Sequence, residues 1–392
     1  MSRLTISERE KTLLEPGASE MRVLHLRSSG GMLGAENVVL ELAKESSTFG
    51  YEGIVGALKN MEDPTPEFIT VAESRGLKTK IFECACSFDI RAALNIKKFI
   101  NNHQVKILHC HGYKEDVFGL VTRAGRISKI ATNHLWKTST LKAKCYCLMD
   151  ALIIRSYDRI VGVSDEIVQG MNNVGIRNAF KIANGIDCAR FNIKPVDAAF
   201  VKKYNLQTSD FVLGMISSLS YEKNHQAVFK AISGMDKPNL KLLIVGSGYL
   251  DKDLRKQVEE MGLSERVVFT GTLSNVTDVL SVVKVFLLPS LSEGLPMALL
   301  EAMASGKAVV ASNVGEVGNV VEHHVNGLLV ERNNIDELRS AIEFFFENKE
   351  KISEYGCAAR SRVVAKFSSK IMAQNYCKIY DSMLSSVASM EK

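Results

Sequence analysis

The chain has 392 residues, of which 46% are apolar and 24% are charged. This length is sufficient for two or three domains that each have a core, and the composition excludes a largely disordered chain and a coiled coil. The sequence contains no run of about 18 uncharged apolar residues, so it predicts no membrane-spanning helix.

Positive charge is modestly concentrated in the first half of the chain. The net charge is +5, and residues 21–195 contain 24 Lys and Arg against 17 Asp and Glu. These charges are spread along the sequence, which is not typical of a nucleic-acid-binding stripe. The excess would suit a phosphate-bearing ligand or an anionic membrane surface, and an ordinary solvated face explains it equally well.

The N-terminus and the cysteines indicate the compartment. Residues 1–20 are polar and contain four Glu, so we interpret them as an appendage and not as a secretory signal. The eight cysteines include two C-x-C pairs, Cys84/Cys86 and Cys145/Cys147, which lack the spacing of zinc or redox motifs. We therefore expect reduced thiols and a cytoplasmic protein.

Short apolar runs alternate with helical patterns along the chain. Runs that are apolar throughout are typical of strands buried on both faces of a parallel sheet, and their alternation with helices predicts α/β units. We predict an α/β protein with two facing Rossmann-like domains, and ligands in a cleft at the carboxyl ends of the strands. The runs lie at residues 22–26, 53–58, 79–84, 106–110, 129–133, 159–164, 181–184, 211–217, 241–246, 266–271, 285–290, 308–312 and 327–330.

A break in this pattern near residues 192–210 predicts the domain organisation. The segment contains Pro195, and a new series of strands and helices follows it. We expect a first domain at 21–195, a second at 196–369, and a C-terminal helix at 370–392 that completes the first.

The most informative segment is FLLPSLSEGLPMALLEAMASG at residues 286–306. It predicts a buried strand, a turn, and a helix with Pro296 at its first position and Gly306 past its end. Unpaired backbone N–H groups at such a helix start form an anion site. Glu293 beside that site and Glu301 within the helix would hold sugar hydroxyls next to a phosphate. Taken alone, Glu293 could instead be a helix-capping residue, and Glu301 could be an ordinary solvated residue of the helix.

The E-x7-E pattern of Glu293 and Glu301, which opens with E-G-x-P, resembles the retaining glycosyltransferases of family 4. That resemblance extends from about residue 22 to residue 380 and implies the GT-B fold. Further segments resemble family motifs in the same order: Gly30 to Glu36, Thr132 to His134, Asn184 to Asp187 with Arg190-Phe191, Leu219 to Asn224, Val245 to Gly248, Thr270-Gly271, and Asn326 to Val330.

The resemblance implies transfer of a sugar, with retention, from a nucleotide-diphosphate sugar to a glycan or lipid-linked acceptor. It favours UDP over GDP and requires no cofactor. The leaving diphosphate gains negative charge, which cations and backbone N–H groups stabilise, so Lys223 is the best candidate cation. The implied catalytic residues are Glu293, Lys223 and His134, and the implied donor-binding residues are Gly30, Gly31, Ser218, Gly246, Leu273, Gly294, Leu295, Pro296 and Glu301.

Individual roles follow from the same resemblance. Glu293 and the backbone N–H groups of Gly294 and Leu295 would contact the donor sugar, and Glu301 would contact the ribose. Gly30 and Gly31 would let the backbone of the first domain approach the donor. His134 would face the sugar or the acceptor, although a packed histidine is the alternative.

The sequence departs from the family pattern at two places. Ser218 stands where the family often has an Arg that acts on the diphosphate together with the Lys. Gly318-Asn319 replaces the usual Pro-Glu. These departures keep a second interpretation open, a catalytically inactive sugar-nucleotide-binding subunit, and a GT-B epimerase or phosphorylase is a third.

Three signals point weakly to other ligands. Gly246-Ser247-Gly248 begins a dinucleotide fingerprint without completing it, and the D-x-D of Asp251 and Asp253 falls at a helix start, where acids favour the helix dipole. His109 and His111 follow a strand, but neither a carboxylate nor a third histidine completes a site. We therefore predict no metal site.

Basic and apolar residues mix in the segment 137–159. Lysines and arginines alternate there with Leu, Tyr and Met, so this part of the first domain could bind anionic lipid at the cytoplasmic face of a membrane. An ordinary helix packed on its sheet is the alternative. The basic residues are Lys137, Lys142, Lys144, Arg155 and Arg159.

Overall fold

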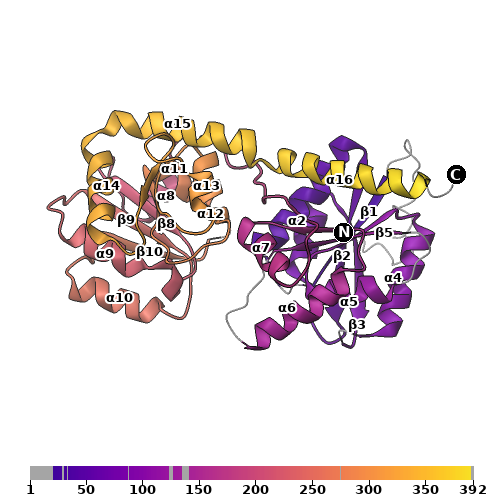
Figure 1. Cartoon of the computed structure of the whole chain (residues 1–392). Helices are drawn as coiled ribbons and strands as arrows, with labels where there is room; N and C mark the ends of the chain where they lie inside the picture. Colours follow the sequence, from indigo (N-terminus) through magenta and orange to yellow (C-terminus); the bar gives the residue numbers. More distant parts are fainter. Residues whose placement is uncertain are drawn as a thin grey trace. The chain divides into compact units, whose positions relative to one another are not determined.

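The computed structural model describes residues 21–28, 31–32, 34–86, 88–122, 127–134, 141–273 and 275–389. The chain divides into two compact units, Met1–Gly185 with Ser369–Lys392, and Ile186–Ser368 (Figure 1). Residues 186–195 therefore belong to the second unit. Backbone pairing explains this, because the N–H of Ile186 donates to the carbonyl of Phe367, and Phe191 is buried in the core of the same unit.

The first unit contains a seven-stranded parallel sheet with the order β3-β2-β1-β4-β5-β6-β7. The strand order changes direction at β1, because β2 and β3 are added on one side of β1 and the later strands are added on the other side. The strands are β1 (Met21–Arg27), β2 (Tyr51–Asn60), β3 (Lys78–Cys84), β4 (Ile107–Cys110), β5 (Ser128–Asn133), β6 (Arg159–Gly162) and β7 (Ala179–Lys181).

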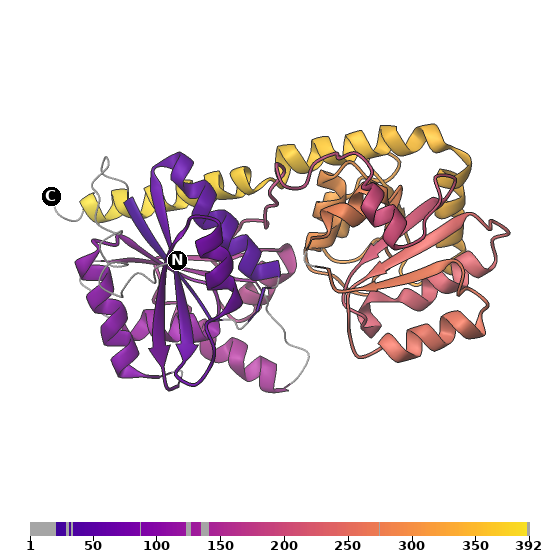
Figure 2. The ribbon, with the colours of Figure 1, turned by 180° about the vertical axis from the view of Figure 1, so that it is seen from behind.

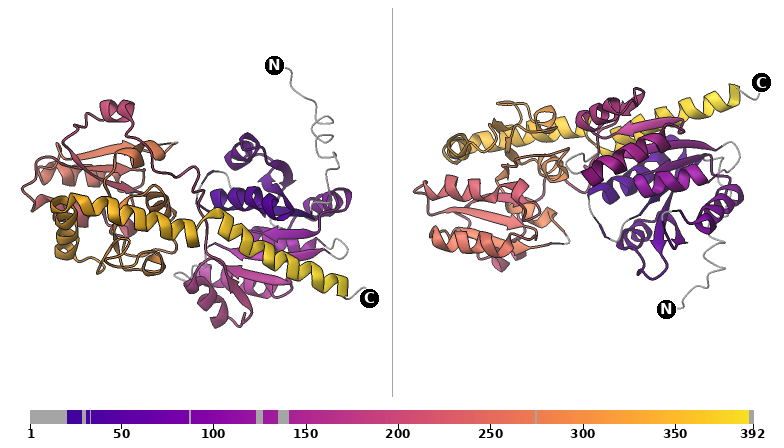
Figure 3. Two further views of the ribbon diagram at one scale, coloured as in Figure 1. Left: turned by 90° about the horizontal axis from the view of Figure 1, so that it is seen from above. Right: turned by 60° about the horizontal axis from the view of Figure 1, so that its bottom comes forward.

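Helices cover both faces of this sheet (Figure 2). One core joins the sheet to α4 (Ile90–Asn102), α5 (Tyr113–Val121), α6 (Leu141–Ile154) and α7 (Asp165–Asn173). A second joins it to α2 (Gly34–Glu45) and α3 (Glu67–Ser74), beside the short η1 (Ser46–Phe49). The C-terminal helix α16 (Ser369–Ser389) lies beside α2 (Figure 3), and the hydroxyl of Tyr51 donates to Asp381 over 2.6 Å.

The second unit contains a six-stranded parallel sheet with the order β10-β9-β8-β11-β12-β13. The strand order changes direction at β8, with β9 and β10 on one side of it and the later strands on the other. The strands are β8 (Phe211–Ile216), β9 (Leu240–Val245), β10 (Val267–Gly271), β11 (Val285–Leu288), β12 (Ala308–Ser312) and β13 (Leu328–Val330).

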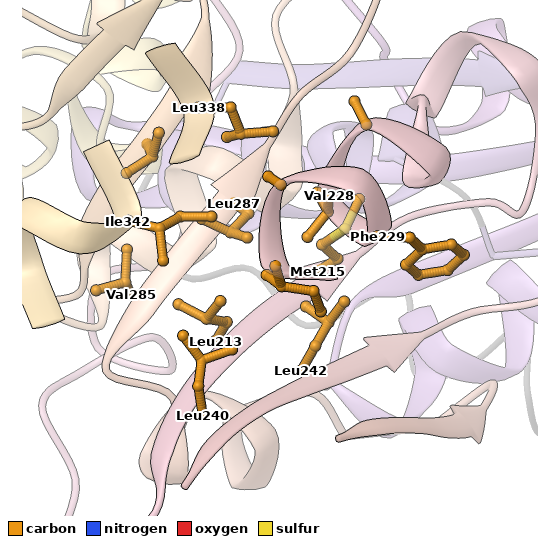
Figure 4. Packing of buried hydrophobic residues seen from close by; sticks show 14 of the residues in the cluster. Leu213, Met215, Val228, Phe229, Leu240, Leu242, Val285, Leu287, Leu338 and Ile342 are labelled. Atoms are coloured by element: carbon orange, nitrogen blue, oxygen red, sulfur yellow. The ribbon is translucent and has the colours of Figure 1, made fainter. Parts of the chain in front are cut away.

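Two apolar cores cover the faces of this second sheet. Figure 4 shows the first, in which Leu213, Leu242 and Leu287 pack against Val228 and Ile342. Its helices are α9 (His225–Ser233), α10 (Asp251–Glu260) and α14 (Ile335–Glu347). The opposite face packs on α8 (Ala198–Lys203), α11 (Thr277–Val282), α12 (Met297–Ala304), α13 (Val317–Val320) and α15 (Lys349–Lys366).

The predicted fold class is confirmed, and each predicted apolar run overlaps a strand. The largest displacement is at β7, which begins two residues before the predicted run and ends at Lys181. Beyond it the N–H of Ile182 still bonds to the carbonyl of Gly162, but the ladder ends there. Among the described residues, no helix combines the length and the apolar character needed to cross a bilayer.

Candidate active site

The predicted donor-binding residues of the second unit follow the carboxyl ends of four adjacent strands. Ser218 follows β8, Gly246 follows β9, Leu273 follows β10, and Glu293 follows β11. Because all these strands are parallel, their carboxyl ends lie on one edge of the sheet, which is where α/β proteins bind ligands. The topology therefore gathers residues that are far apart in the sequence.

The Glu293 carboxylate is the centre of this edge. Its Oε1 accepts from Lys223 Nζ over 2.6 Å and from Ser290 Oγ over 2.6 Å. The Glu293 side chain is only 7% exposed, whereas that of Lys223 is 23% exposed. A charge-assisted hydrogen bond between partly desolvated groups is stronger than a surface ion pair. One carboxylate oxygen of Glu293 is thereby fixed by two donors.

The turn that carries Lys223 is fixed by its neighbours. A short 3₁₀ helix, η2 (Tyr221–Lys223), ends at Asn224, whose φ of 52° reverses the chain. The Asn224 side-chain amide donates to the carbonyl of Pro289 over 3.3 Å, and the N–H of Leu291 donates to the carbonyl of Glu222 over 2.8 Å. These bonds join the loop after β8 to the loop after β11, so the ammonium of Lys223 reaches Glu293.

The helix start next to Glu293 provides backbone N–H groups. Pro296 precedes α12, and the N–H groups of Leu299 and Leu300 both donate to its carbonyl. The earlier N–H groups have no acceptor within the helix, which makes the start of α12 suitable for an anion. At the far end Gly306 adopts a φ of +69°, as a glycine after a helix commonly does.

The loop after β12 packs on the backbone of Glu293 and Gly294. Gly315 has a φ of +54°, and a Cβ there would lie 1.8 Å from the carbonyl oxygen of Glu293, so only glycine fits. The N–H of Glu316 donates to the carbonyl of Gly294, and the Asn319 amide donates to the Glu316 carboxylate over 2.9 Å. Asn319, which departs from the family pattern, thus helps to fix the loop that packs on the backbone of Glu293.

The loops after β8 and β9 approach each other closely. Gly246 has a φ of +136°, and a Cβ there would lie 1.9 Å from the carbonyl oxygen of Ser217. Ser218 is exposed, and its hydroxyl lies 3.3 Å from that of Ser220. Leu273 is half-buried and packs against the core formed with α8 and α11. Position 218 therefore contributes a small neutral side chain.

Glu301 differs from Glu293 in its electrostatics. It lies in the second turn of α12, and burial raises its pKa to about 7, while Arg190 opposes this shift. Glu301 therefore titrates close to neutral pH. Arg190 belongs to the segment from Asn184 to Phe191 that resembles a family motif, and the motif indicates no role for Arg190 itself.

A cavity of about 900 Å³ in the second unit contains none of the predicted site residues. It lies against β13 and α14, where His323, His324 and Phe344 are among its lining residues. We assign it no role, because the charged groups described above lie outside its lining.

The Gly-rich segment of the first unit is described only in part. Gly30 and Leu33 lie outside the described residues, whereas Gly31 follows β1. Glu36 is 1% exposed and forms an ion pair with Arg27 at 2.8 Å. The end of the Gly-rich segment is thus fixed to β1 by this pair, which the sequence motif did not indicate.

His134 follows β5 and belongs to a group of four histidines. The prediction that no third histidine accompanies His109 and His111 was wrong, because the parallel register of β1 with β4 places His25 opposite His109. His25, His109 and His111 are buried and could in principle hold a metal ion. Burial lowers the pKa of His25 and of His134 to about 3, so both rings are neutral.

Two buried aspartates near the same strands were also missed. Asp116 on α5 is 0% exposed and Asp150 on α6 is 2% exposed, and the Asn133 amide donates to Asp150 over 3.3 Å. Burial raises the pKa of Asp150 to about 6 and that of Asp116 well above its usual range. For Asp150 the available signal was a single charged residue in the otherwise apolar run of residues 145–154, whereas Asp116 follows Lys114 and Glu115 and gave no such signal.

Comparison with known proteins agrees with this arrangement. The model of the family "Glycosyltransferase Family 4" matches residues 32–190, and that of "Glycosyl transferases group 1" matches residues 197–362. A UDP-Gal:alpha-D-GlcNAc-diphosphoundecaprenol alpha-1,3-galactosyltransferase of Escherichia coli is 25% identical over 65% of this chain and 70% of its own. An N,N'-diacetylbacillosaminyl-diphospho-undecaprenol alpha-1,3-N-acetylgalactosaminyltransferase of Campylobacter jejuni is 23% identical over 85% of this chain and 95% of its own.

The fold also matches solved structures. The structure of Anabaena HepE in complex with UDP superposes with a TM-score of 0.80 at 21% identity, over 92% of this chain and 100% of that chain. The chain has two Rossmann-like units, and the candidate site residues follow the ends of their strands, as in the GT-B class of glycosyltransferases. The chain belongs to glycosyltransferase family 4.

Proposed function

We propose that the protein is a retaining, metal-independent transferase that moves a hexosyl or N-acetylhexosaminyl group from a UDP-sugar to a glycan or lipid-linked acceptor. The observation that carries this proposal is the contact of Lys223 and Ser290 with Glu293 beside the start of α12. The names of the two relatives above, whose acceptors carry diphosphoundecaprenol, support a lipid-linked acceptor. The UDP complex of the structural neighbour supports UDP as the nucleotide.

In this proposal, donor binding rearranges the Lys223–Glu293 ion pair. Negative charge grows on the diphosphate oxygens as the sugar–phosphate bond breaks. The Lys223 ammonium and the N–H groups at the start of α12 interact with these oxygens and stabilise that charge. Glu293 loses part of its interaction with Lys223 and accepts from a sugar hydroxyl instead. Glu301 accepts from the ribose hydroxyls. The incoming acceptor hydroxyl gives its proton to the departing phosphate, which balances the transfer without a metal.

A thermal-shift panel of UDP-, GDP- and ADP-sugars tests the choice of donor. A ligand at 100 times its dissociation constant stabilises the folded protein by about 2.7 kcal/mol. We expect UDP-sugars to raise the melting temperature and the others to have smaller effects. Stabilisation by a GDP- or ADP-sugar alone would refute the choice of UDP.

Glu301 makes the affinity for UDP depend on pH. Only the ionised carboxylate accepts two ribose hydroxyls, and with a pKa of about 7 it is mostly protonated at pH 6 and mostly ionised at pH 8. Affinity should therefore rise by roughly tenfold between these values, with release of a proton on binding. Calorimetry should show this rise in the wild type and lose it in Glu301→Gln. The variant is a matched control, because titration of the UDP phosphate affects both proteins equally.

Transfer is expected to survive EDTA, because Lys223 and the start of α12 supply the positive charge that a metal would supply. The Asp251 side chain is already used, since it accepts from Arg255 Nε over 3.2 Å within α10. Activity should be measured after extended dialysis against EDTA. Complete loss that Mn²⁺ or Mg²⁺ restores would contradict metal independence and point to Asp251 and Asp253.

We further propose that α6 places the protein on the cytoplasmic face of an anionic membrane. Large apolar side chains of this helix are exposed, and Arg155 is exposed directly after it, which is the pattern of an interfacial helix. The exposed fractions are 50% for Tyr146, 54% for Leu148, 52% for Met149 and 66% for Leu152. Lys137 lies outside the described residues, as do the side chains of Lys142 and Lys144.

Vesicle sedimentation tests this surface. Leu148→Glu with Leu152→Glu is expected to weaken binding to phosphatidylglycerol vesicles at least tenfold, since each leucine contributes about 1.5–3 kcal/mol when fully buried. Leu94→Glu is a matched control, because Leu94 is 59% exposed but lies on α4. Equal losses in the control and the double variant, or no binding by the wild type, would refute the membrane surface.

A further inference from the structure

A short turn at residues 187–191 lies at the start of the second unit and contains Arg190. One carboxylate oxygen of Asp187, Oδ1, accepts from the N–H of Ala189 over 2.8 Å and from the N–H of Arg190 over 3.0 Å. The N–H of Phe191 donates to the carbonyl of Asp187 over 2.9 Å. These bonds fix the backbone of Arg190 and of its neighbours, although the Arg190 side chain itself is exposed.

Arg360, on α15, attaches this turn to the end of α12. Its Nη1 donates to the carbonyl of Phe191 over 3.0 Å and also to the carbonyl of Ala304, and its Nη2 donates to the carbonyl of Cys188 over 3.3 Å. Phe191 is buried in the same apolar core as Leu300 of α12. Hydrogen bonds and apolar packing therefore both hold the turn against the helix.

This attachment places Arg190 beside the face of α12 on which Glu301 lies. Ala304 is the last residue of α12, and Glu301 precedes it by three residues, so the two lie on one face of the helix. The Arg190 guanidinium lies over the Phe191 ring, 5.1 Å from the ring centre. The charge of Arg190 reaches Glu301, because burial raises the pKa of that carboxyl to about 7 and Arg190 opposes the rise.

Other charged side chains come from segments that pack against α12, and most of them are engaged with other partners. β11 and β12 contain no charged residues. Lys307 follows the far end of α12, and burial lowers its pKa to about 8. Of the described residues, Arg190 is the one whose charge opposes the effect of burial on Glu301. The engaged side chains are Arg360 and Arg362 on α15, Glu293 before α12, Glu316 before α13 and Asp187 in the turn.

We propose that Arg190 is a positioning residue of the donor site, which acts on the nucleotide through Glu301 and does not itself contact the nucleotide. This inference rests on the proposed function for the contact between Glu301 and the ribose. The guanidinium attracts the Glu301 carboxylate and favours its ionised form, which is the form that accepts two ribose hydroxyls. The Asp187 turn, the Phe191 ring and the Arg360 hydrogen bonds hold the guanidinium in place.

Carboxyl carbon-13 NMR of the full chain with labelled glutamate tests the electrostatic link without any ligand. The Glu301→Gln variant assigns the Glu301 signal, which should titrate near pH 7 in the wild type. In Arg190→Gln the midpoint should rise by roughly 0.5–1 pH unit, since removal of a nearby cation disfavours the charged form of a carboxyl. Arg190→Lys keeps the charge and should keep the midpoint close to that of the wild type.

Arg255→Gln is the matched control for this titration. Arg255 is an exposed arginine of α10 in the same unit, and its replacement should not move the Glu301 midpoint. An unchanged midpoint in Arg190→Gln would overturn the proposal, and so would an equal shift in the control. Because no nucleotide is present, this answer does not depend on transferase activity or on UDP binding.

Calorimetry with UDP distinguishes positioning from direct contact. At pH 7, Arg190→Gln should bind UDP roughly two- to fivefold more weakly than the wild type, because a smaller fraction of Glu301 is ionised. At pH 9, Glu301 is ionised in both proteins, and the two affinities should be equal. In a Glu301→Gln background, Arg190→Gln should have no further effect.

Two results of this experiment would overturn the proposal. Weaker binding by Arg190→Gln at pH 9 would show that Arg190 contacts the nucleotide or supports the fold. A further loss of affinity in the double variant would show that Arg190 does not act through Glu301. If the wild type does not bind UDP at all, the proposed function fails, and the carboxyl titration alone decides whether Arg190 acts on Glu301.

Discussion

Replacing Lys223 with Ala is expected to lower turnover by roughly 10²–10³-fold, which corresponds to about 2.7–4 kcal/mol of lost transition-state stabilisation. The side chain at position 218 is a serine whose hydroxyl lies beside that of Ser220, so it offers no second cation for the diphosphate. Under the proposed function, Lys223 would therefore carry more of the leaving-group charge. Steady-state kinetics at saturating donor should show this loss, with UDP affinity reduced as well.

A matched control is Lys252→Ala, because Lys252 is an exposed lysine of α10 in the same unit. It should leave turnover unchanged. Ser218→Arg is the companion test, since the side chain at this position is exposed. It should tighten UDP binding by roughly tenfold, as one charged hydrogen bond would, and partly restore turnover to Lys223→Ala. Near-normal turnover in Lys223→Ala would mean that a different cation serves the diphosphate.

Glu293→Gln is expected to lower turnover by roughly 10–150-fold, the effect of a hydrogen bond to a charged group of about 1.5–3 kcal/mol. The amide keeps the shape of the side chain and removes the charge that attracts Lys223 and that, in the proposed function, accepts from the sugar. Lys223 is then free for the diphosphate, so UDP affinity should stay constant or increase. Discrimination between donor sugars should decline. Calorimetry with UDP and kinetics with two UDP-sugars separate these effects.

The contrast with Glu301→Gln makes this prediction specific. At pH 8 that variant should lose affinity for UDP itself, since Glu301 would bind the ribose. Equal loss of UDP affinity in both variants would contradict the separate roles. Unchanged turnover in Glu293→Gln would remove Glu293 from the reaction.

The periodicity of the sequence was sufficient to predict the fold, because buried parallel strands are apolar throughout. Local signals also located the ends of α12, because Pro296 directly precedes the helix and Gly306 follows it with a φ of +69° that other residues adopt at a cost. Such features depend on a few neighbouring residues. They can be predicted without knowing which strands pair.

Features that depend on register were not predictable in the same way. His25 lies in the middle of an apolar run and meets His109 only because β1 pairs with β4 in one particular register, across more than 80 residues of sequence. The contact of Lys223 with Glu293 requires β8 and β11 to be neighbours. Tyr376 and Tyr380 are four residues apart on α16, which predicts a shared face but not the bonds to Thr132 and His109.

Donor hydrolysis in the presence of EDTA tests the central claim most directly. The chain is incubated with a UDP-sugar that stabilises it, and proton NMR follows the anomer of the sugar that is first released to water. Because UDP-glucose and its relatives are α-linked, a retaining transferase is predicted to release the α anomer slowly, and Lys223→Ala should release much less. Initial release of the β anomer would contradict retention. UDP binding without any hydrolysis, across donors that bind, would instead identify a sugar-nucleotide-binding subunit that has no transferase activity.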